Sequence, residues 1–244
     1  MTDSDPIVGR MAEEVAIVTG STSGLGRSIA LRFAEEGARV VVTGRNAERG
    51  ERVVASCADA PGEVVFVAAD LSLEDECARL VDTCVERFGS LTVLVNNAVA
   101  TQVEPRDAKV EFLATETWEQ VHRVGITAVM WMCRAAIPAM RSAGRGSIIN
   151  VSSRAAERAT PNMPAYAATK GGMNALTRAI YDANRERGFS MLTTTIIRGM
   201  QVLRICAINP RVEDAQLRRS LEILAEIGQA LCAQGGVPRL ERSS

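Results

Sequence analysis

Short apolar segments alternate with longer segments of helical periodicity along most of the chain, and this alternation restricts the fold more than any other sequence feature. Strands that are apolar on both faces and separated by helices are typical of a parallel sheet covered on both sides. Right-handed crossovers then give a doubly wound α/β domain. The apolar segments are residues 15–19, 40–43, 64–68, 91–96 and 147–152, and the helical segments are 24–36, 46–58, 73–88, 117–141 and 165–187.

The 244 residues are enough to bury a full core in one large domain or two small ones. No internal repeat, linker or break in composition occurs before about residue 188. We therefore predict a single domain over residues 1–244, in which 188–244 form an atypical C-terminal region. A chain that is 47% hydrophobic with a net charge of −1 is not disordered. That charge also gives no electrostatic basis for binding nucleic acid or an anionic membrane.

The N-terminus and the cysteines predict a cytoplasmic protein. The segment MTDSDPIVGRM has neither the basic start nor the apolar core of a signal peptide. No segment approaches the ~20 apolar residues that span a bilayer. The six cysteines form no CxxC pair and have no clustered histidines, so we expect reduced, buried thiols and no metal site.

A glycine-rich connection, TGSTSGLG at residues 19–26, follows the first apolar segment and leads into the first helix. Glycine lets the backbone turn sharply and approach a pyrophosphate, which the N-terminus of the helix attracts. We expect dinucleotide binding here; the alternative is a tight strand-to-helix turn without a ligand. A P-loop would need a following Lys-Ser/Thr pair, and a hydrolase elbow would need serine at Thr22. The candidate cofactor-binding residues are Gly20, Thr22, Ser23, Gly24, Leu25 and Gly26.

The segment after the second apolar run indicates which cofactor is bound. A ribose 2′-hydroxyl needs an acidic acceptor about 20 residues past the glycines, whereas a 2′-phosphate needs arginine. The segment reads VTGRN, with Arg45 and no carboxylate. It favours NADP(H) and leaves NAD(H) possible. The alternative is a solvated arginine that opens a helix.

A tyrosine and a lysine share one face of the helix predicted at 165–187. Tyr166 and Lys170 are four residues apart, so they lie one turn from each other. A neighbouring ammonium favours the ionised phenol, which can give or take a proton at a carbonyl or alcohol near neutral pH. Ser152 and Ser153 end the fifth apolar segment, at the sheet edge where such domains bind ligands. The alternative is a solvated i, i+4 pair.

Taken together, these motifs resemble the short-chain dehydrogenase/reductase family, whose fold is Rossmann-like. The matching motifs lie in the family's order across roughly residues 11–187: the glycine loop, Asp70-Leu71, Asn96-Asn97-Ala98, Ser153 and Tyr166-x-x-x-Lys170. The resemblance implies a carbonyl or secondary alcohol as the small-molecule substrate and a nicotinamide cofactor.

By this resemblance Tyr166 is the general acid/base, and Ser153 orients the substrate oxygen. Lys170 binds the nicotinamide ribose and promotes ionisation of the tyrosine. The resemblance also implies that four further residues contact the cofactor: Asp70 at the adenine, Leu71 in that pocket, and Asn97 with Ala98 near the ribose. Two alternatives stay open, because Asp70 could be only a helix N-cap and Asn96-Asn97 an ordinary turn.

Two residues depart from the family pattern near the site. Val99 stands where the family usually has glycine, and Gly125 stands where most members have an asparagine that helps to hold a water for proton relay. We predict that the proton relay is altered. The alternative function is therefore a dinucleotide-binding protein with impaired or no catalysis. A hydrolase using Ser153 would need a histidine base, and His122, the only histidine, has no motif around it.

The last quarter of the sequence departs most from the family. Residues 191–197 and 202–208 compete for the sixth strand, 212–231 form a plausible helix, and no convincing seventh strand follows it. The substrate pocket would be walled by residues 99–116 and 198–230, with 101–114 as a lid or a surface loop. The resemblance implies a homodimer or homotetramer paired through the helices at 117–141 and 165–187. The small and apolar residues Ala128, Met132, Ala135, Ala136 and Ala175 suit such pairing or an internal core.

Overall fold

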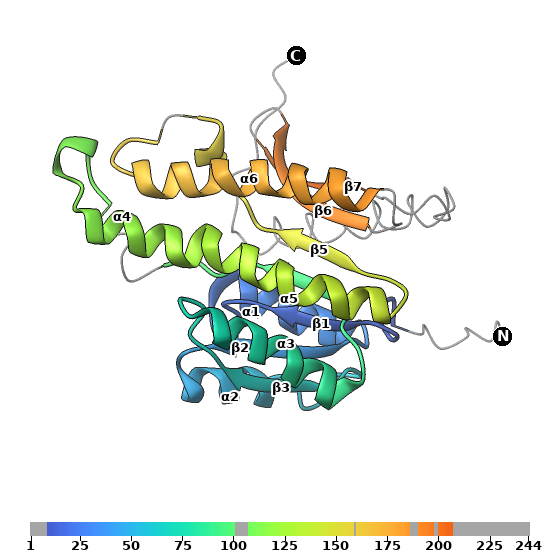
Figure 1. Cartoon of the computed structure of the whole chain (residues 1–244). Helices are drawn as coiled ribbons and strands as arrows, with labels where there is room; N and C mark the ends of the chain where they lie inside the picture. Colours follow the sequence, from blue (N-terminus) through green and yellow to red (C-terminus); the bar gives the residue numbers. More distant parts are fainter. Residues whose placement is uncertain (1–8, 101–106, 159, 186–189, 198–199, 207–244) are drawn as a thin grey trace, which may run out of the picture.

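The computed structural model describes residues 9–100, 107–158, 160–185, 190–197 and 200–206. Within them, one seven-stranded sheet has the order β3-β2-β1-β4-β5-β6-β7, parallel except for β7, which pairs antiparallel with β6 (Figure 1). The strands are β1 Val15–Val18, β2 Arg39–Gly44, β3 Val64–Ala68, β4 Val93–Asn96, β5 Ser147–Asn150, β6 Ser190–Ile197 and β7 Met200–Cys206. The helices are α1 Gly24–Glu35, α2 Ala47–Ala55, α3 Glu74–Phe88, α4 Thr115–His122, α5 Ala128–Ser142 and α6 Pro164–Arg185, with the short turns η2 Val110–Phe112, η3 Arg123–Thr127 and η4 Arg154–Ala156.

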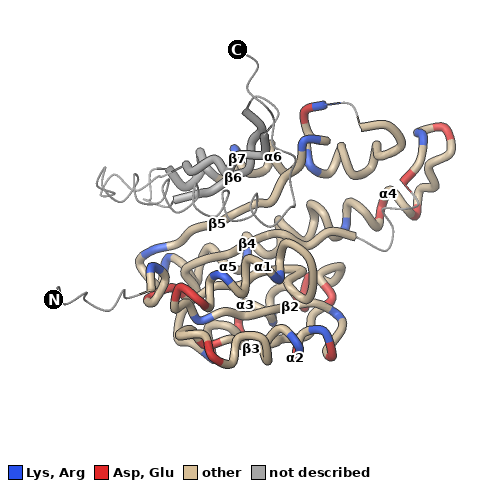
Figure 2. Tube along the Cα trace, turned by 180° about the vertical axis from the view of Figure 1, so that it is seen from behind, with Lys and Arg blue, Asp and Glu red and all other residues tan. Residues whose placement is uncertain are grey.

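Each face of the sheet has its own hydrophobic core, because alternate residues of a strand point to opposite faces. Val15 and Ile17 of β1 pack in a core with α3, α5 and α6. Ala16 and Val18 pack in the other core with α1 and α2. Strands β1, β4 and β5 carry no charged residue, and the charges lie mostly on helices and connections (Figure 2).

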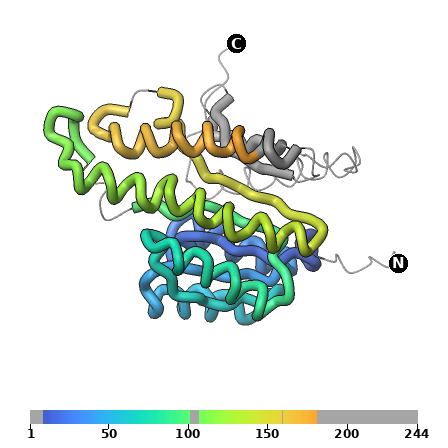
Figure 3. The backbone as a smooth tube through the Cα atoms, in the orientation of Figure 1, coloured from blue at the N-terminus to red at the C-terminus, as the bar shows by residue number. Residues whose placement is uncertain are grey.

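Buried amide side chains fix α6 on the sheet. Asn96, at the end of β4, donates from Nδ2 to Oδ1 of Asn150 at 2.8 Å. Asn150, at the end of β5, donates from Nδ2 to Oγ1 of Thr177 in α6 at 2.8 Å. α6 lies beside α4 and η3 (Figure 3). These bonds place the helix that carries Tyr166 and Lys170 relative to the carboxyl ends of the strands.

The structure confirms the predicted fold class. The first five strands form where the apolar segments predicted them, with ends that differ by two residues or fewer. Gly37 has a φ of +90° just after α1, as expected of a glycine that ends a helix in the left-handed region.

Two predictions about element bounds need correction. The predicted helix at 117–141 is divided into α4 and α5 by the π-helical turn η3. The two segments that competed for the sixth strand are both strands: 190–197 is the sixth, parallel to β5, and 200–206 returns beside it as a seventh. A two-residue connection cannot join parallel neighbours, so the second segment pairs antiparallel.

Other expectations lie outside the described residues. They include the helix at 212–231, residues 198–199 and 207–230 of the predicted pocket wall, and residues 101–106 of the possible lid. In the part of the chain that the structure describes, no helix combines the length and apolarity needed to cross a membrane.

Candidate active site

The glycine loop joins β1 to α1, and different structural constraints explain why glycine occupies its different positions. A Cβ on Gly20 would lie 2.8 Å from Ala98 Cα, and a Cβ on Gly26 would lie 2.4 Å from Asn97 Nδ2. These two positions are therefore glycine because of packing within the protein. Gly24 has a φ of +53°, and a Cβ added there would meet no atom within 4 Å. It begins α1 on the exposed side of the loop, which fits the approach of a pyrophosphate to the N-terminus of that helix.

Thr19 connects the glycine loop to the segment after β4. Its Oγ1 accepts hydrogen bonds from the backbone N–H groups of Asn97 at 2.9 Å and Ala98 at 3.0 Å. The side chain of Asn97 donates back to the carbonyl oxygen of Thr19 at 2.9 Å. Asn96 is buried and bonded to Asn150. This segment is therefore tied to the loop rather than forming the ordinary turn left open by the sequence, and the half-buried Val99 follows it.

Asp70 and Leu71 follow β3 at the same edge of the sheet. Asp70 Oδ1 accepts a hydrogen bond from the N–H of Ser72 at 3.0 Å, while Leu73 holds the N-cap position of α3. Asp70 is therefore not the N-cap of that helix. Leu71 is buried.

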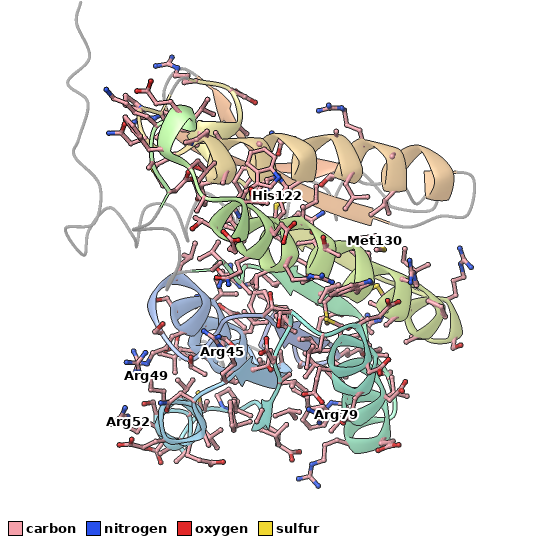
Figure 4. The ribbon with its side chains drawn as sticks, turned by 60° about the vertical axis from the view of Figure 1, so that its left-hand side comes forward. Arg45, Arg49, Arg52, Arg79, His122 and Met130 are labelled. Carbon is pink, nitrogen blue, oxygen red and sulfur yellow. The ribbon has the colours of Figure 1, made fainter. Side chains whose placement is uncertain are left out.

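Arginines surround the outer side of the glycine loop (Figure 4). Arg45 is exposed directly after β2. A Cβ on Gly44 would lie 2.8 Å from Thr22 Cγ2, so the end of β2 touches the loop. An open pocket of about 470 Å³ lies beside the glycine loop. It is lined by Thr22, Ser23, Gly24, Arg27, Arg49, Arg52, Val53 and Ser56. Arg27, Arg49 and Arg52 were not predicted as site residues from the sequence, although the i, i+3 spacing of the last two was an available signal.

Lys170 is buried and lies close to the Tyr166 ring. The lysine is 1% exposed, and its Nζ donates a hydrogen bond to the carbonyl oxygen of Val151 at 2.7 Å. The same Nζ lies 5.7 Å from the centroid of the half-buried Tyr166 ring. The two residues are therefore not a solvated surface pair. The lysine anchors α6 to the segment that leads from β5 to Ser153.

Ser153 caps the short turn η4. Its Oγ accepts a hydrogen bond from the N–H of Ala155 at 3.2 Å, so the hydroxyl hydrogen is not used in that bond. Because Ser153 follows β5 as Asn97 follows β4, both residues lie at the carboxyl edge of the parallel sheet.

The π-helical turn η3 places Gly125 against α6. Gly125 is buried, and a Cβ there would lie 2.3 Å from Cγ2 of Thr169. Thr169, which precedes Lys170, is 1% exposed, and its Oγ1 has no hydrogen-bond partner among the described residues. Single π-helical turns inside α-helices often occur at functional sites.

Asp107 is a site residue that sequence reasoning missed. This buried carboxylate accepts hydrogen bonds from the backbone N–H groups of Ala165 and Tyr166. A signal was present in the sequence, because Met163-Pro164 at the start of the helix offers no capping side chain.

The remaining titratable candidates are His122 and the buried cysteines. The half-buried ring of His122 packs on Trp118, with centroids 4.1 Å apart, and its Nδ1 lies 2.9 Å from that residue's carbonyl oxygen. Burial raises the pKa values of Cys77, Cys84 and Cys133 to about 12. Among the described residues, no group of three His, Cys, Asp or Glu side chains could hold a metal ion.

The sheet order and the glycine connection define a doubly wound, Rossmann-like domain with its candidate site at the carboxyl edge of the strands. A family model for short chain dehydrogenases matches residues 14–199. The chain belongs to the short-chain dehydrogenase/reductase family.

Two named relatives are identical to this chain at about two fifths of the aligned positions. The chain is 40% identical over 174 residues to a 3beta-hydroxysteroid dehydrogenase of Mediterraneibacter gnavus, covering 71% of this chain and 62% of the relative. It is 39% identical over 171 residues to an NADP-dependent (R)-specific alcohol dehydrogenase of Lentilactobacillus kefiri, covering 70% of this chain and 66% of the relative. The match thus spans about two thirds or less of each relative's length. The crystal structure of a metagenomic short-chain oxidoreductase in complex with NADP aligns with a TM-score of 0.70 at 32% identity, covering 75% of this chain and 81% of that chain.

Proposed function

We propose that this chain is an NADP(H)-dependent oxidoreductase that transfers a hydride between nicotinamide and a carbonyl or secondary alcohol carbon. The observation that carries the proposal is the buried Lys170 ammonium, which lies 5.7 Å from the Tyr166 ring centroid. It is held on Val151 at the same sheet edge as the glycine loop. We place the cofactor and substrate sites in one domain.

The cofactor supplies or accepts the hydride when bound. In the reducing direction, Tyr166 Oη donates its proton to the carbonyl oxygen as the carbon takes up the hydride, and an alcohol results. The Ser153 hydroxyl donates a hydrogen bond to the same oxygen and holds it in place. The Lys170 ammonium favours the phenolate that remains, because an adjacent opposite charge stabilises the ionised form. In the oxidising direction these proton transfers are reversed.

The residues around the glycine loop fit a dinucleotide. Gly20, Thr22, Ser23, Gly24, Leu25 and Gly26 would hold the pyrophosphate, Asp70 and Leu71 the adenine, and Asn97, Ala98, Tyr166 and Lys170 the nicotinamide ribose. A preference for NADP(H) is supported by the exposed Arg45 and by the arginine-lined pocket beside it. The NADP-dependent relative and the NADP-bound neighbour support the same preference.

The oligomeric part of the proposal is a homodimer or homotetramer. Of the residues that suited helix pairing, Ala128, Met132 and Ala136 are buried in the protein's own core and Ala135 packs against it, so they do not support pairing. The fifth of these residues, Ala175, is exposed on α6, and it is the remaining support together with the exposed apolar side chains of Val110, Phe112 and Trp118. Light scattering of the purified protein measures the assembly directly.

The test is NADPH oxidation with a panel of ketones and aldehydes, with NADH in parallel. We expect turnover with NADPH, and we expect Tyr166→Phe to abolish it while NADPH affinity changes less than threefold. Tyr181→Phe makes the same chemical change four turns along α6 and is the matched control. NADPH binding without turnover of any carbonyl would instead support the alternative of a cofactor-binding protein without catalysis.

A further inference from the structure

The helix that carries Tyr166 starts without a local cap. α6 begins at Pro164, so Met163 stands at the N-cap position, where its side chain offers no hydrogen-bond acceptor. Pro164 has no N–H. The N–H groups of Ala165 and Tyr166 therefore need acceptors from elsewhere.

A carboxylate from a distant part of the chain supplies both acceptors. Asp107 Oδ1 accepts from the N–H of Ala165 at 3.3 Å, and Oδ2 accepts from the N–H of Tyr166 at 2.9 Å, across 58 and 59 residues of sequence. Asp107 is 7% exposed and lies in the connection between β4 and α4. A carboxylate at a helix N-terminus is favourable, and its hydrogen bonds are stronger than those of a neutral acceptor.

One of these bonds reaches the backbone of the proposed general acid itself. Tyr166 is thus fixed by its own N–H on Asp107, and its helix is fixed one turn later by Lys170 on Val151. The two anchors come from the connections after β4 and β5, the strands that carry Asn97 and Ser153 at their carboxyl ends.

We propose that Asp107 is a positioning residue for Tyr166, a role that rests on the proposed function of the tyrosine. Asp107 does not exchange a proton with the substrate. It fixes where the first turn of α6 lies, and thereby the distance at which the phenol meets the substrate oxygen. Misplacement of a reacting group by about 1 Å can cost on the order of a hundredfold in rate.

Two variants separate positioning from folding. Asp107→Ala removes both acceptors, whereas Asp107→Asn keeps an oxygen that can accept from Tyr166 and presents an amide to Ala165. Asp82→Ala, on the exposed face of α3, is the matched control. For each protein we would measure kcat and KM for a ketone, NADPH affinity, and amide hydrogen exchange in a peptide from the start of α6.

We expect kcat to fall about tenfold to a hundredfold in Asp107→Ala, with KM and NADPH affinity within about threefold of the original protein. Asp107→Asn should recover part of kcat. Hydrogen exchange should increase at residues 165–170 in Asp107→Ala and remain unchanged in α1 and α3. The control variant should match the original protein in every measurement.

Unchanged kcat in Asp107→Ala would overturn the proposal, as would a kcat that falls only in proportion to the fraction of protein able to bind NADPH. If Asp107→Ala does not fold, an Asp107→Asn variant with unchanged kcat and unchanged exchange at residues 165–170 would overturn it equally. An original protein that turns over no carbonyl would refute the proposed function instead, and the exchange measurement would still report whether Asp107 holds the helix.

Discussion

The methyl group of Thr169 takes the place that a side chain at position 125 would need, since a Cβ on Gly125 would lie 2.3 Å from Thr169 Cγ2. A second contact of the same kind lies one turn along α6, where a Cβ on Gly172 would meet Ile126 Cδ1 at 2.6 Å. The turn η3 and the helix α6 therefore approach closely, because a glycine of each faces a larger side chain of the other. The glycine at position 125 is matched by the shape of its neighbour Thr169.

We predict that Gly125→Asn alone destabilises the protein by about 1–3 kcal/mol, because overpacking displaces a buried side chain. Adding Thr169→Ser removes the methyl group and should recover most of this loss, which urea unfolding would measure. Thr169→Ser alone is the control. A double variant that is as stable as the original protein but no faster would contradict the prediction that Gly125 alters the proton relay.

Arg45 should set the cofactor preference. We predict that Arg45→Ala raises the Kd for NADPH about tenfold to a hundredfold, as expected when a charge-assisted bond to a phosphate is lost. The Kd for NADH should change less than threefold, because NADH has no 2′-phosphate. Arg87→Ala, an exposed arginine on α3, is the control in fluorescence titrations. Equal losses for both cofactors would refute a role in discrimination.

Glu36 should make stability depend on pH in the acid range. The side-chain hydrogen bond from Arg10 is the main cause that lowers the pKa of Glu36 to about 2, and Arg32 also pairs with it. Since the pKa is depressed on folding, its stabilisation is present above about pH 4.5 and is lost as pH falls towards 2. We predict that Glu36→Gln costs about 1–3 kcal/mol at pH 7 and almost nothing near pH 2. A loss independent of pH in urea unfolding would contradict this account; Glu48→Gln, in an exposed pair with Arg52, is the control.

The buried cysteines should resist alkylation in the native protein. Desolvation raises the pKa values of Cys77, Cys84 and Cys133 to about 12, so almost no thiolate exists at pH 8. Iodoacetamide followed by peptide mass spectrometry should find these three sites unmodified until urea unfolds the chain. Rapid labelling of Cys133, which lies against Asn96, would show that this core opens under native conditions.

The sequence predicted those parts of the fold that depend on local pattern. The apolar run Val64–Ala68 became a strand with the predicted bounds beside β2, because β-branched and aromatic residues favour strands. The π-helical turn η3 was not predictable in this way. Its Gly125 packs against Thr169 of α6, a tertiary contact that no spacing within the segment encodes.

The candidate site likewise contains residues that local spacing predicts and residues that only tertiary contacts bring together. Tyr166 and Lys170 were found because a spacing of four is a local property of one helix. Asp107 was missed because its partners lie 58 and 59 residues away, and only the fold brings them together. Residues 202–208 were predicted as a possible strand, but the antiparallel pairing of the observed strand 200–206 with β6 depends on tertiary context.

The hydrogen bonds that run from Asn96 through Asn150 to Thr177 have a consequence for how new specificities could arise in this protein. They join the adjacent strands β4 and β5 to the tyrosine-bearing helix through buried side chains. Residues of the 99–116 connection other than Asp107 can accordingly be exchanged to accommodate a different alcohol, while these bonds and Asp107 keep the proton donor in place.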